Sequence, residues 1–599
     1  MKFDSKQLKE MSDAARSGAI YAIRNANSGH VGIALGAADI LTTIYANHLR
    51  RDVDKFVLSA GHGSALLYSV LKLSGYNIQS LQSFRKFGGL PGHPEYGIDG
   101  VAATTGPLGQ GIGNAVGMAL AEKINRARGG KKSDGIVYCL CSDGDLMEGV
   151  ANESIAFAGL YKLDNLVLLW DDNKISIDGT ALTDIDMPSR MQAAGFAVFT
   201  INGNNFKALD TVLAQAKKIN APVFIQCQTV LGAGMSVAGT PAAHGLSIGV
   251  LELTRLEEKF TSANGLKLWD LVAKSAKTSS LIPEQNESKL PNNFCVDVGD
   301  ISSRELSARY LEKLIWDNNH LLGGSADLGG STSTKVPGHR DIMPGDFSGN
   351  FINYGVREHA MGAIMNGLCS AGFRPYGGTF LAFSDYMRPA IRLSALSRLP
   401  VIYVLTHDSI AVGEDGPTHQ PVEQLASLRL IPNLNVFRPC NAAEVAASWG
   451  MALSETARPS CIILSRQKFE QISTPSNADI SCGGYIIKSN GAKIPKVTLI
   501  ATGSEVPLAI AVAKKLGNTA VVSMLSVEKF RVQSEDYKKK ILRGYVVSIE
   551  AGATSGWFEF ADAVMGIDEF GASGSGDEVY DRFGFNVDKI ACEIKHRIK

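Results

Sequence analysis

The feature that most constrains the fold is a repeated alternation of short, continuously apolar runs with helical patterns. The runs are each followed by a polar or glycine-containing turn; examples are IVYCLCSD, NLVLLWDDN, LPVIYVLTHDS and KVTLIATGS. Continuous apolar strands are typical of parallel sheets that helices cover on both faces. In folds of this kind, ligands bind beyond the carboxyl ends of the strands. We therefore expect an α/β protein whose mostly parallel sheets carry functional residues in the turns after the strands.

Two polar, proline-containing stretches suggest where domains end. The length of 599 residues predicts three or four domains, at roughly 100–200 residues for each. KSAKTSSLIPEQNESKLPNN reads as a linker, and FEQISTPSNADISCGG as a second break. We expect three α/β domains at 1–275, 300–467 and 484–599, with the linker at 276–299.

Composition excludes several classes of protein. Lysine and arginine number 59, as do aspartate and glutamate, so we expect neither nucleic acid nor an anionic membrane as a partner. No apolar run approaches the roughly 18–20 residues of a membrane helix, and the N-terminus lacks an apolar signal core. The nine cysteines form no CxxC pair, which argues against a zinc site and a disulfide framework. A reducing cytoplasm fits these features best.

Acidic residues follow two neighbouring predicted strands. Asp143 comes directly after IVYCLCS, and NLVLLW is followed by Asp171, Asp172 and Asn173. Adjacent parallel strands would bring these oxygen ligands to one place, where Mg²⁺ or Ca²⁺ could bind together with phosphate oxygens. The alternative is that the acidic residues only cap turns and helices.

The segment TTGPLGQGIGNAVGMALAEK, residues 104–123, is rich in glycine at the start of a helical pattern. Such a turn lets backbone N–H groups and the helix dipole approach a phosphate. Its spacing does not fit the GxGxxG pattern of nicotinamide-binding folds, and the chain has no GxxxxGK[ST]. The alternative is close helix packing through glycine.

Histidines and one glutamate are further candidates. Six of the eleven histidines lie in turn-like settings, where they could donate hydrogen bonds or move protons, although a single histidine is more often structural; they are His30, His62, His93, His244, His407 and His419. Glu358, in NYGVREHAMGAIMNG, is either a charge at a helix start or a buried acid that meets a ligand nitrogen. The aromatic residues Phe380, Phe383 and Tyr386 could stack on a flat ring or simply pack in the core.

Taken together, these stretches resemble the transketolase family over nearly the whole chain. The motifs that carry the resemblance occur in the family's order: SGH, SAGHGS, GHPE, TTGPLGQG, SDGDLMEG with DDNKISIDG, YGVREHAMGAI, PYGGTF and THDSIAVGEDGPTHQPVEQ. The family binds thiamine diphosphate with a divalent ion. The resemblance implies a diphosphate-binding first domain, a pyrimidine-binding second domain and a C-terminal transketolase domain. It also implies a homodimer with the active site at the interface.

The resemblance implies a role for each motif position. Asp143, Asn173 and the backbone carbonyl of Ile175 would hold Mg²⁺, Ca²⁺ or another divalent ion. The residues that would bind the cofactor are His62, Gly106, Pro107, Leu108, Asp143, Gly144, Asn173, Glu358 and Phe383. Glu358 would protonate N1′ of the aminopyrimidine, and Phe383 would stack on that ring.

The implied substrates are sugar phosphates. His30, His93, His244 and His419 would contact the reacting end of a ketose, and Asp415 would recognise a sugar hydroxyl. The residues that would grip the phosphate are Arg304, Ser331, His407 and Arg466. The implied reaction moves a two-carbon ketol unit from a ketose phosphate such as xylulose 5-phosphate to an aldose phosphate such as ribose 5-phosphate, in the pentose phosphate pathway.

Three other functions are alternatives to this reaction. 1-Deoxyxylulose-5-phosphate synthase uses the same cofactor and similar domains, but GPLGQG, GHPE, YGVREH and GPTHQPVEQ favour transketolase. Dihydroxyacetone synthase keeps most of the motifs. A non-catalytic scaffold is expected to have lost Glu358, the pair Asp143 and Asn173, or the phosphate arginines, and all of these are present.

Overall fold

The computed structural model describes residues 2–129, 134–180, 185–244, 248–275, 288–291, 294, 299–491 and 494–598. The chain forms two compact units. The first comprises 1–284, 343–348 and 363–372, and the second comprises 285–342, 349–362 and 373–599. Most of the predicted linker, 276–299, lies outside the described residues.

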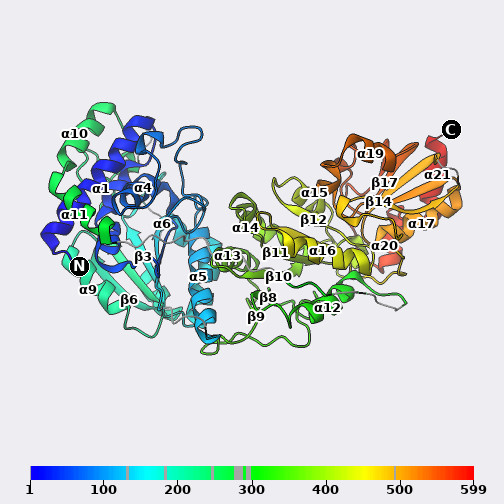
Figure 1. Ribbon diagram of the computed structural model, residues 1–599, viewed down its shortest axis with the longest axis horizontal. Helices are drawn as coiled ribbons and strands as arrows, with labels where there is room; N and C mark the ends of the chain where they lie inside the picture. The colour runs from blue at the N-terminus through cyan, green and yellow to red at the C-terminus, as the bar shows by residue number, and fades with distance from the viewer. Residues whose placement is uncertain are drawn as a thin grey trace. The chain divides into compact units, whose positions relative to one another are not determined.

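Three mostly parallel sheets flanked by helices confirm the predicted fold class of three α/β domains (Figure 1). One sheet lies in the first unit and two lie in the second. The strands of each sheet fall within one of the predicted ranges, whose boundaries stay predictions.

The first sheet is parallel throughout, in the order β1(Lys55–Leu58), β2(Val137–Ser142), β3(Leu166–Asp172), β7(Val223–Gln228) and β6(Ala197–Asn202). A short antiparallel pair, β4(Ile175–Ser176) and β5(Gly179–Thr180), follows β3. The α-helices of this part of the chain are α1(Ser5–Ala26), α2(Val31–Gly36), α3(Ala38–Thr43), α4(Ser64–Leu73), α5(Gln110–Ala127), α6(Asp143–Met147), α7(Gly149–Leu160), α8(Met187–Ala193), α9(Phe206–Ala216), α10(Val250–Phe260) and α11(Ala263–Ser275).

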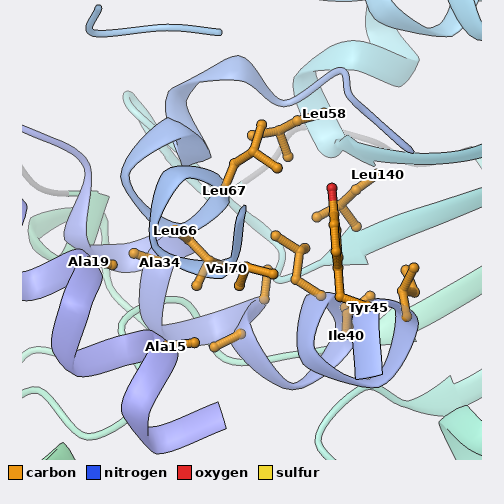
Figure 2. Packing of buried hydrophobic residues seen from close by; sticks show 14 of the residues in the cluster. Ala15, Ala19, Ala34, Ile40, Tyr45, Leu58, Leu66, Leu67, Val70 and Leu140 are labelled. Atoms are coloured by element: carbon orange, nitrogen blue, oxygen red, sulfur yellow. The ribbon is translucent and has the colours of Figure 1, made fainter. Parts of the chain in front are cut away.

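The core of the first unit joins one face of this sheet to the helices of the N-terminal segment. Alternate residues of the strands point into it, as the two-residue repeat of a strand requires. Small alanines on α1 and α2 allow these helices to approach the rest of the core closely. Figure 2 shows Ala15, Ala19, Ala34, Ile40, Tyr45, Leu58, Leu66, Leu67, Val70 and Leu140 in this cluster.

The second sheet is also parallel, in the order β12(Asn435–Phe437), β13(Ser460–Leu464), β11(Ile402–Thr406), β10(Arg374–Phe380), β8(Leu321–Ser325) and β9(Phe351–Asn353). Its helices are α12(Ser303–Leu314), α13(Glu358–Ser370), α14(Ser384–Leu396), α15(Gln424–Arg429) and α16(Ala442–Ser454).

The third sheet belongs to the C-terminal domain, in the order β14(Tyr485–Asn490), β16(Thr519–Ser523), β15(Val497–Ala501), β17(Tyr545–Ile549) and β18(Ala563–Met565). Only β14 runs antiparallel within it. Its helices are α17(Glu505–Leu516), α18(Val527–Arg531), α19(Glu535–Ile541), α20(Gly576–Arg582) and α21(Val587–Arg597).

Candidate active-site residues

The acidic residues of the first unit meet at the carboxyl ends of β2 and β3. Asp143 is the first residue of α6, directly after β2, and it is buried. Asp171 and Asp172 end β3 rather than follow it, and Ser142 pairs with Asp171 across the parallel strands. The structure therefore brings together the acidic residues that were predicted to follow two neighbouring strands.

The three carboxylates differ in how their hydrogen-bonding capacity is met. Asp171 accepts from the Asn173 amide at 3.0 Å and from the Thr229 hydroxyl. Asp172 accepts from Gln226 at 2.6 Å. In contrast, no described residue donates a hydrogen bond of ordinary geometry to either oxygen of Asp143. A buried carboxylate in this state is costly unless a cation or a proton meets it.

The pKa of Asp143 reflects this environment. Burial, followed by the charges of Asp172 and Asp171, raises it to about 7, and the Lys174 ammonium and Trp170 indole only partly oppose the shift. A divalent cation bound to Asp143 would favour its ionised form and so offset this penalty.

The other predicted metal ligands lie in the turn that follows β3. The Asn173 side-chain oxygen accepts from the Ile175 backbone N–H at 3.0 Å, so the turn is closed on itself. Lys174 between them adopts a left-handed conformation, with φ of 64°. Among the described residues, no group of three or more His, Cys, Asp or Glu side chains could hold a metal. The predicted set differs in kind, since it combines one carboxylate with an amide oxygen and a backbone carbonyl.

Four histidines of the first unit form a cluster. The ring centroid of His30 lies 5.3 Å from His62, 6.2 Å from His93 and 5.5 Å from His244. Burial lowers the pKa of His30 to about 4 and of His62 to about 3, and the neighbouring histidines add to both shifts. Burial also lowers the pKa of His93 and of His244. The cluster is therefore neutral near pH 7 and can both donate and accept hydrogen bonds.

The glycine turn before α5 lies against this cluster. Gly106 has a φ of 134°, and a side chain there would meet the His93 ring at 3.3 Å. A Cβ on Gly61 would lie 2.7 Å from the Gly106 nitrogen, and one on Gly144 would lie 2.8 Å from the Leu108 side chain. The predicted cofactor-binding turn, 106–108, thus packs directly on the segments that carry His62, His93 and Asp143.

The alternative interpretation of the glycines holds for the later ones. A Cβ on Gly113 would lie 2.5 Å from the Ala363 side chain, and one on Gly117 would lie 2.1 Å from the Ile364 carbonyl oxygen. These glycines allow α5 to pack closely on α13 from Ala363 onward. The segment therefore combines an open turn with a close helix contact.

Asp145 is a residue of this region that the sequence did not single out. It is fully buried and accepts from the Gly109 backbone N–H at 2.7 Å and from the Ser59 hydroxyl at 2.6 Å. Ser142 donates to it through both its backbone N–H and its hydroxyl, at 2.9 Å each. Asp145 thus ties the glycine turn to the ends of β1 and β2. Its position two residues after Asp143 was the only available signal.

In the second unit, Glu358 opens α13 and is 8% exposed. Burial raises its pKa, while its own backbone N–H and the Thr379 hydroxyl, at 3.4 Å from Oε1, offset part of the shift. The position is a helix start, as the simpler interpretation held, but the side chain is also a buried acid whose pKa is raised.

Aromatic rings and two histidines gather at the ends of β10 and β11 in the same unit. The Phe380 ring lies 3.7 Å from His407, and Phe383 lies 5.2 Å from His419. Phe383 is only partly buried, and Tyr386 is 66% exposed. Phe383 therefore keeps an accessible ring, whereas Phe380 is part of the core.

The predicted phosphate-binding residues form a second polar group there. Arg304, near the start of α12, donates to the Ser331 carbonyl, and Arg466, which follows β13, donates to the Val412 carbonyl at 2.9 Å. Burial, followed by the charges of Arg304 and Arg466, lowers the pKa of His407 to about 3. Two guanidiniums beside one neutral imidazole form a site for an anion. Asp415 lies on an exposed loop close in sequence to His419.

Carboxylates and imidazoles at the carboxyl ends of parallel sheets, beside a glycine turn, define an α/β enzyme that binds a diphosphate-bearing cofactor. Family models match three successive segments: "Transketolase, thiamine diphosphate binding domain" over 7–273, "Transketolase, pyrimidine binding domain" over 299–471 and "Transketolase-like TK C-terminal domain" over 483–586. The chain belongs to the transketolase family, which confirms the resemblance seen in the sequence, and its cofactor is thiamine diphosphate.

Similar proteins agree with this over nearly the whole chain. A transketolase of Sinorhizobium medicae is 40% identical over 646 aligned residues, which cover 98% of this chain and 93% of the relative. The solved transketolase of Leishmania mexicana is 34% identical with a TM-score of 0.92, covering 100% of this chain and 98% of that one. The solved transketolase of Campylobacter jejuni is 36% identical with a TM-score of 0.88, covering 99% and 100%.

Within the described part of the chain, no helix has both the length and the apolar character that crossing a membrane requires.

Proposed function

We propose that this chain transfers a two-carbon ketol unit from a ketose phosphate, such as xylulose 5-phosphate, to an aldose phosphate, such as ribose 5-phosphate. It would do so in the cytoplasm as a homodimer whose active site lies at the subunit interface, as the family resemblance implies. The observation that carries the proposal is the buried Asp143, which no described residue satisfies and which lies beside a glycine turn suited to a diphosphate.

The residues present fit the cofactor and a divalent ion. Asp143, the Asn173 side chain and the Ile175 carbonyl would hold Mg²⁺ or Ca²⁺, which prefer such oxygen ligands. His62, Gly144 and the turn of Gly106, Pro107 and Leu108 would hold the cofactor. When bound, thiamine diphosphate supplies an electron sink that allows the carbon–carbon bond beside a ketose carbonyl to break.

Glu358 would hold a proton at N1′ of the aminopyrimidine. Burial raises the pKa of this carboxyl above its ordinary value, which suits an acid that shares a proton with a ring nitrogen. Phe383, whose ring is partly accessible, would stack on the pyrimidine and fix its plane.

The substrate would contact histidines at its reacting end. His30, His93 and His244 are neutral near pH 7, so they can donate to hydroxyl and carbonyl oxygens or move a proton. His419 would act at the same end, and Asp415 would accept from a sugar hydroxyl. Arg304, Ser331, His407 and Arg466 would bind the phosphate.

A coupled assay tests the proposal. Xylulose 5-phosphate and ribose 5-phosphate would be supplied with and without thiamine diphosphate and Mg²⁺, and the release of glyceraldehyde 3-phosphate would be followed. We expect release only with the cofactor. A thermal shift with thiamine diphosphate and Mg²⁺ reports binding separately, so binding without any turnover would overturn the proposed reaction.

A further inference from the structure

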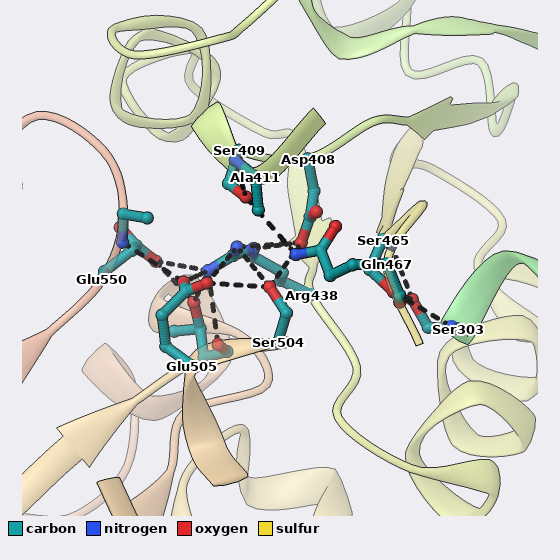
Figure 3. A network of polar contacts seen from close by, with 12 residues as sticks. Ser303, Asp408, Ser409, Ala411, Arg438, Ser465, Gln467, Ser504, Glu505 and Glu550 are labelled. Carbon is teal, nitrogen blue, oxygen red and sulfur yellow. Dashed lines mark hydrogen bonds and ion pairs between the residues drawn. The ribbon is translucent and has the colours of Figure 1, made fainter. Parts of the chain in front are cut away.

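A buried arginine, Arg438, directly follows β12 in the second unit and is 1% exposed. Its Nε and Nη2 donate to Asp408 Oδ2 at 3.1 and 2.8 Å. Its Nη1 donates to the Thr502 hydroxyl at 2.7 Å and to Glu505 at the start of α17. A buried guanidinium is costly unless its donors are met, and here the second and third sheets both supply acceptors (Figure 3).

The network continues from Glu505 back to the second sheet. The Tyr580 hydroxyl of α20 donates to Glu505 Oε1 at 2.7 Å and shares a hydrogen bond with the Ser409 hydroxyl at 3.0 Å. Gln467 Nε2 also contacts Ser409 Oγ, at 3.4 Å. The C-terminal domain is therefore bonded to Asp408 through Arg438 and to Ser409 through Tyr580.

A second part of the network fixes the segments after β13 and before α12. The Ser465 backbone N–H donates to the Ser303 hydroxyl at 2.7 Å, and the Ser303 backbone N–H donates to Ser465 Oγ at 3.1 Å. The Ser465 hydroxyl donates in turn to the Gln467 carbonyl at 3.1 Å. Two serine side chains and the Gln467 backbone carbonyl thus hold the two segments together.

Three of the proposed phosphate-binding residues are immediate sequence neighbours of these network members. His407 precedes Asp408, Arg466 lies between Ser465 and Gln467, and Arg304 follows Ser303. His407 also has a φ of 62°, which is a left-handed backbone conformation. For a residue other than glycine this conformation is unfavourable in free energy unless the surroundings enforce it. Asp408, held by two donors of Arg438, enforces it from the next position.

We propose that Arg438 and Tyr580 are positioning residues for the phosphate end of the substrate, and that the C-terminal domain thereby sets the preference for phosphorylated sugars. The inference rests on the phosphate-binding role proposed above. A network that only joined the two domains would not need to contact the segments of three of the four phosphate-binding residues. Buried ion pairs can often be replaced by apolar residues without loss of stability, so stability alone does not require this one, and the geometry that it fixes gives it a role.

The test compares a phosphorylated donor with one that lacks phosphate. Arg438→Lys keeps the charge but loses the paired donors that reach Asp408. With glycolaldehyde as acceptor, we expect kcat/KM for xylulose 5-phosphate to fall about tenfold or more, and kcat/KM for hydroxypyruvate to stay within about twofold. Tyr580→Phe removes a single hydroxyl and should lower the ratio of kcat/KM for xylulose 5-phosphate to kcat/KM for hydroxypyruvate in the same way. It replaces Arg438→Lys as the test if that variant does not fold.

Arg374→Lys is the matched control. Arg374 is also a buried arginine of this unit, but it lies at the start of β10, where it donates to the Pro400 and Glu455 carbonyls. It should leave the ratio of the two kcat/KM values unchanged. If the Arg438 and Tyr580 variants lost kcat/KM equally with xylulose 5-phosphate and hydroxypyruvate, or showed no change with either, the inference would be overturned.

Arg466→Ala, measured in parallel, separates this inference from the function on which it rests. If Arg466→Ala impairs the phosphorylated donor substrate selectively and Arg438→Lys and Tyr580→Phe do not, the positioning role is wrong and the phosphate-binding role stands. If none of the three variants discriminates, both are wrong.

Discussion

Replacing Glu358 by glutamine should move activity and stability in opposite directions. Glutamine keeps the shape of the side chain but cannot pass a proton to a ring nitrogen, and loss of a positioned acid typically costs 10²–10⁴ in rate. We therefore expect kcat to fall by about 10²–10⁴, which corresponds to about 3–5 kcal/mol in the barrier. The fold should survive, because the side chain makes only one side-chain hydrogen bond in the described structure, at 3.4 Å from Thr379.

The sign of the stability change follows from the pKa of Glu358. Burial raises it above the ordinary value of 4.5, so above pH 4.5 the unfolded chain ionises more readily and the native state loses stability as the pH rises. Glutamine has no such loss. The variant should therefore equal or exceed the parent in stability at pH 7–8, by up to about 2 kcal/mol, the desolvation penalty of one polar group. This difference should vanish well below pH 4.5.

Urea unfolding across this pH range and the coupled assay measure the two quantities. Glu528→Gln is the matched control, because burial also raises the pKa of Glu528 but α18 carries no candidate site residue. It should shift stability in the same direction and leave kcat within about twofold. A Glu358→Gln enzyme with kcat within about threefold of the parent would refute the proton-holding role, and a pH-independent loss of stability would refute the reasoning from burial.

Three further outcomes follow from the structure. Arg466→Ala should raise KM for xylulose 5-phosphate about tenfold or more and KM for hydroxypyruvate much less; equal effects would contradict its role at the phosphate. Asp143→Asn should abolish the thermal shift that Mg²⁺ adds to thiamine diphosphate, and an unchanged Mg²⁺ dependence would exclude Asp143 as a ligand. Gly117→Ala should destabilise the protein by about 1–3 kcal/mol in urea unfolding, since its Cβ would lie 2.1 Å from a backbone carbonyl, whereas Gly149→Ala meets nothing within 4 Å and should be nearly neutral.

The parts of the site that the sequence predicted are those built from local chain order. A strand followed at once by a polar turn places Asp143 and His407 at carboxyl ends of parallel sheets, and both lie there. The rule works because buried parallel strands leave their polar residues only at the two ends.

What the sequence did not reveal depends on residues far apart in the chain. Arg438 bonds Glu505 across 67 positions and Asp408 across 30, and FRPCNAAE shows no pattern that marks the arginine as buried. Similarly, α13 begins with Glu358 in the second unit, yet its residues from 363 onward belong to the first. The close packing of Gly113 and Gly117 on Ala363 and Ile364 agrees with this division.

Buried acids of this chain also show why a raised pKa alone would not have identified the site. Burial raises the pKa of Asp145 and Glu444 as well as that of Asp143 and Glu358, and structural networks are known to shift pKa values as active sites do.

The hydrogen bonds that these carboxylates accept distinguish Asp145 and Glu444 from Asp143 and Glu358. Asp145 accepts four hydrogen bonds, from Ser59, Gly109 and both donors of Ser142, and Glu444 accepts from Cys440, Tyr485 and Ser523. Among the described residues, Asp143 accepts none of ordinary geometry, and the only side-chain donor to Glu358 is the Thr379 hydroxyl at 3.4 Å. The described structure thus meets the hydrogen-bonding capacity of Asp145 and Glu444, whereas that of Asp143 and Glu358 stays largely available, as the ligand-binding roles proposed for them require.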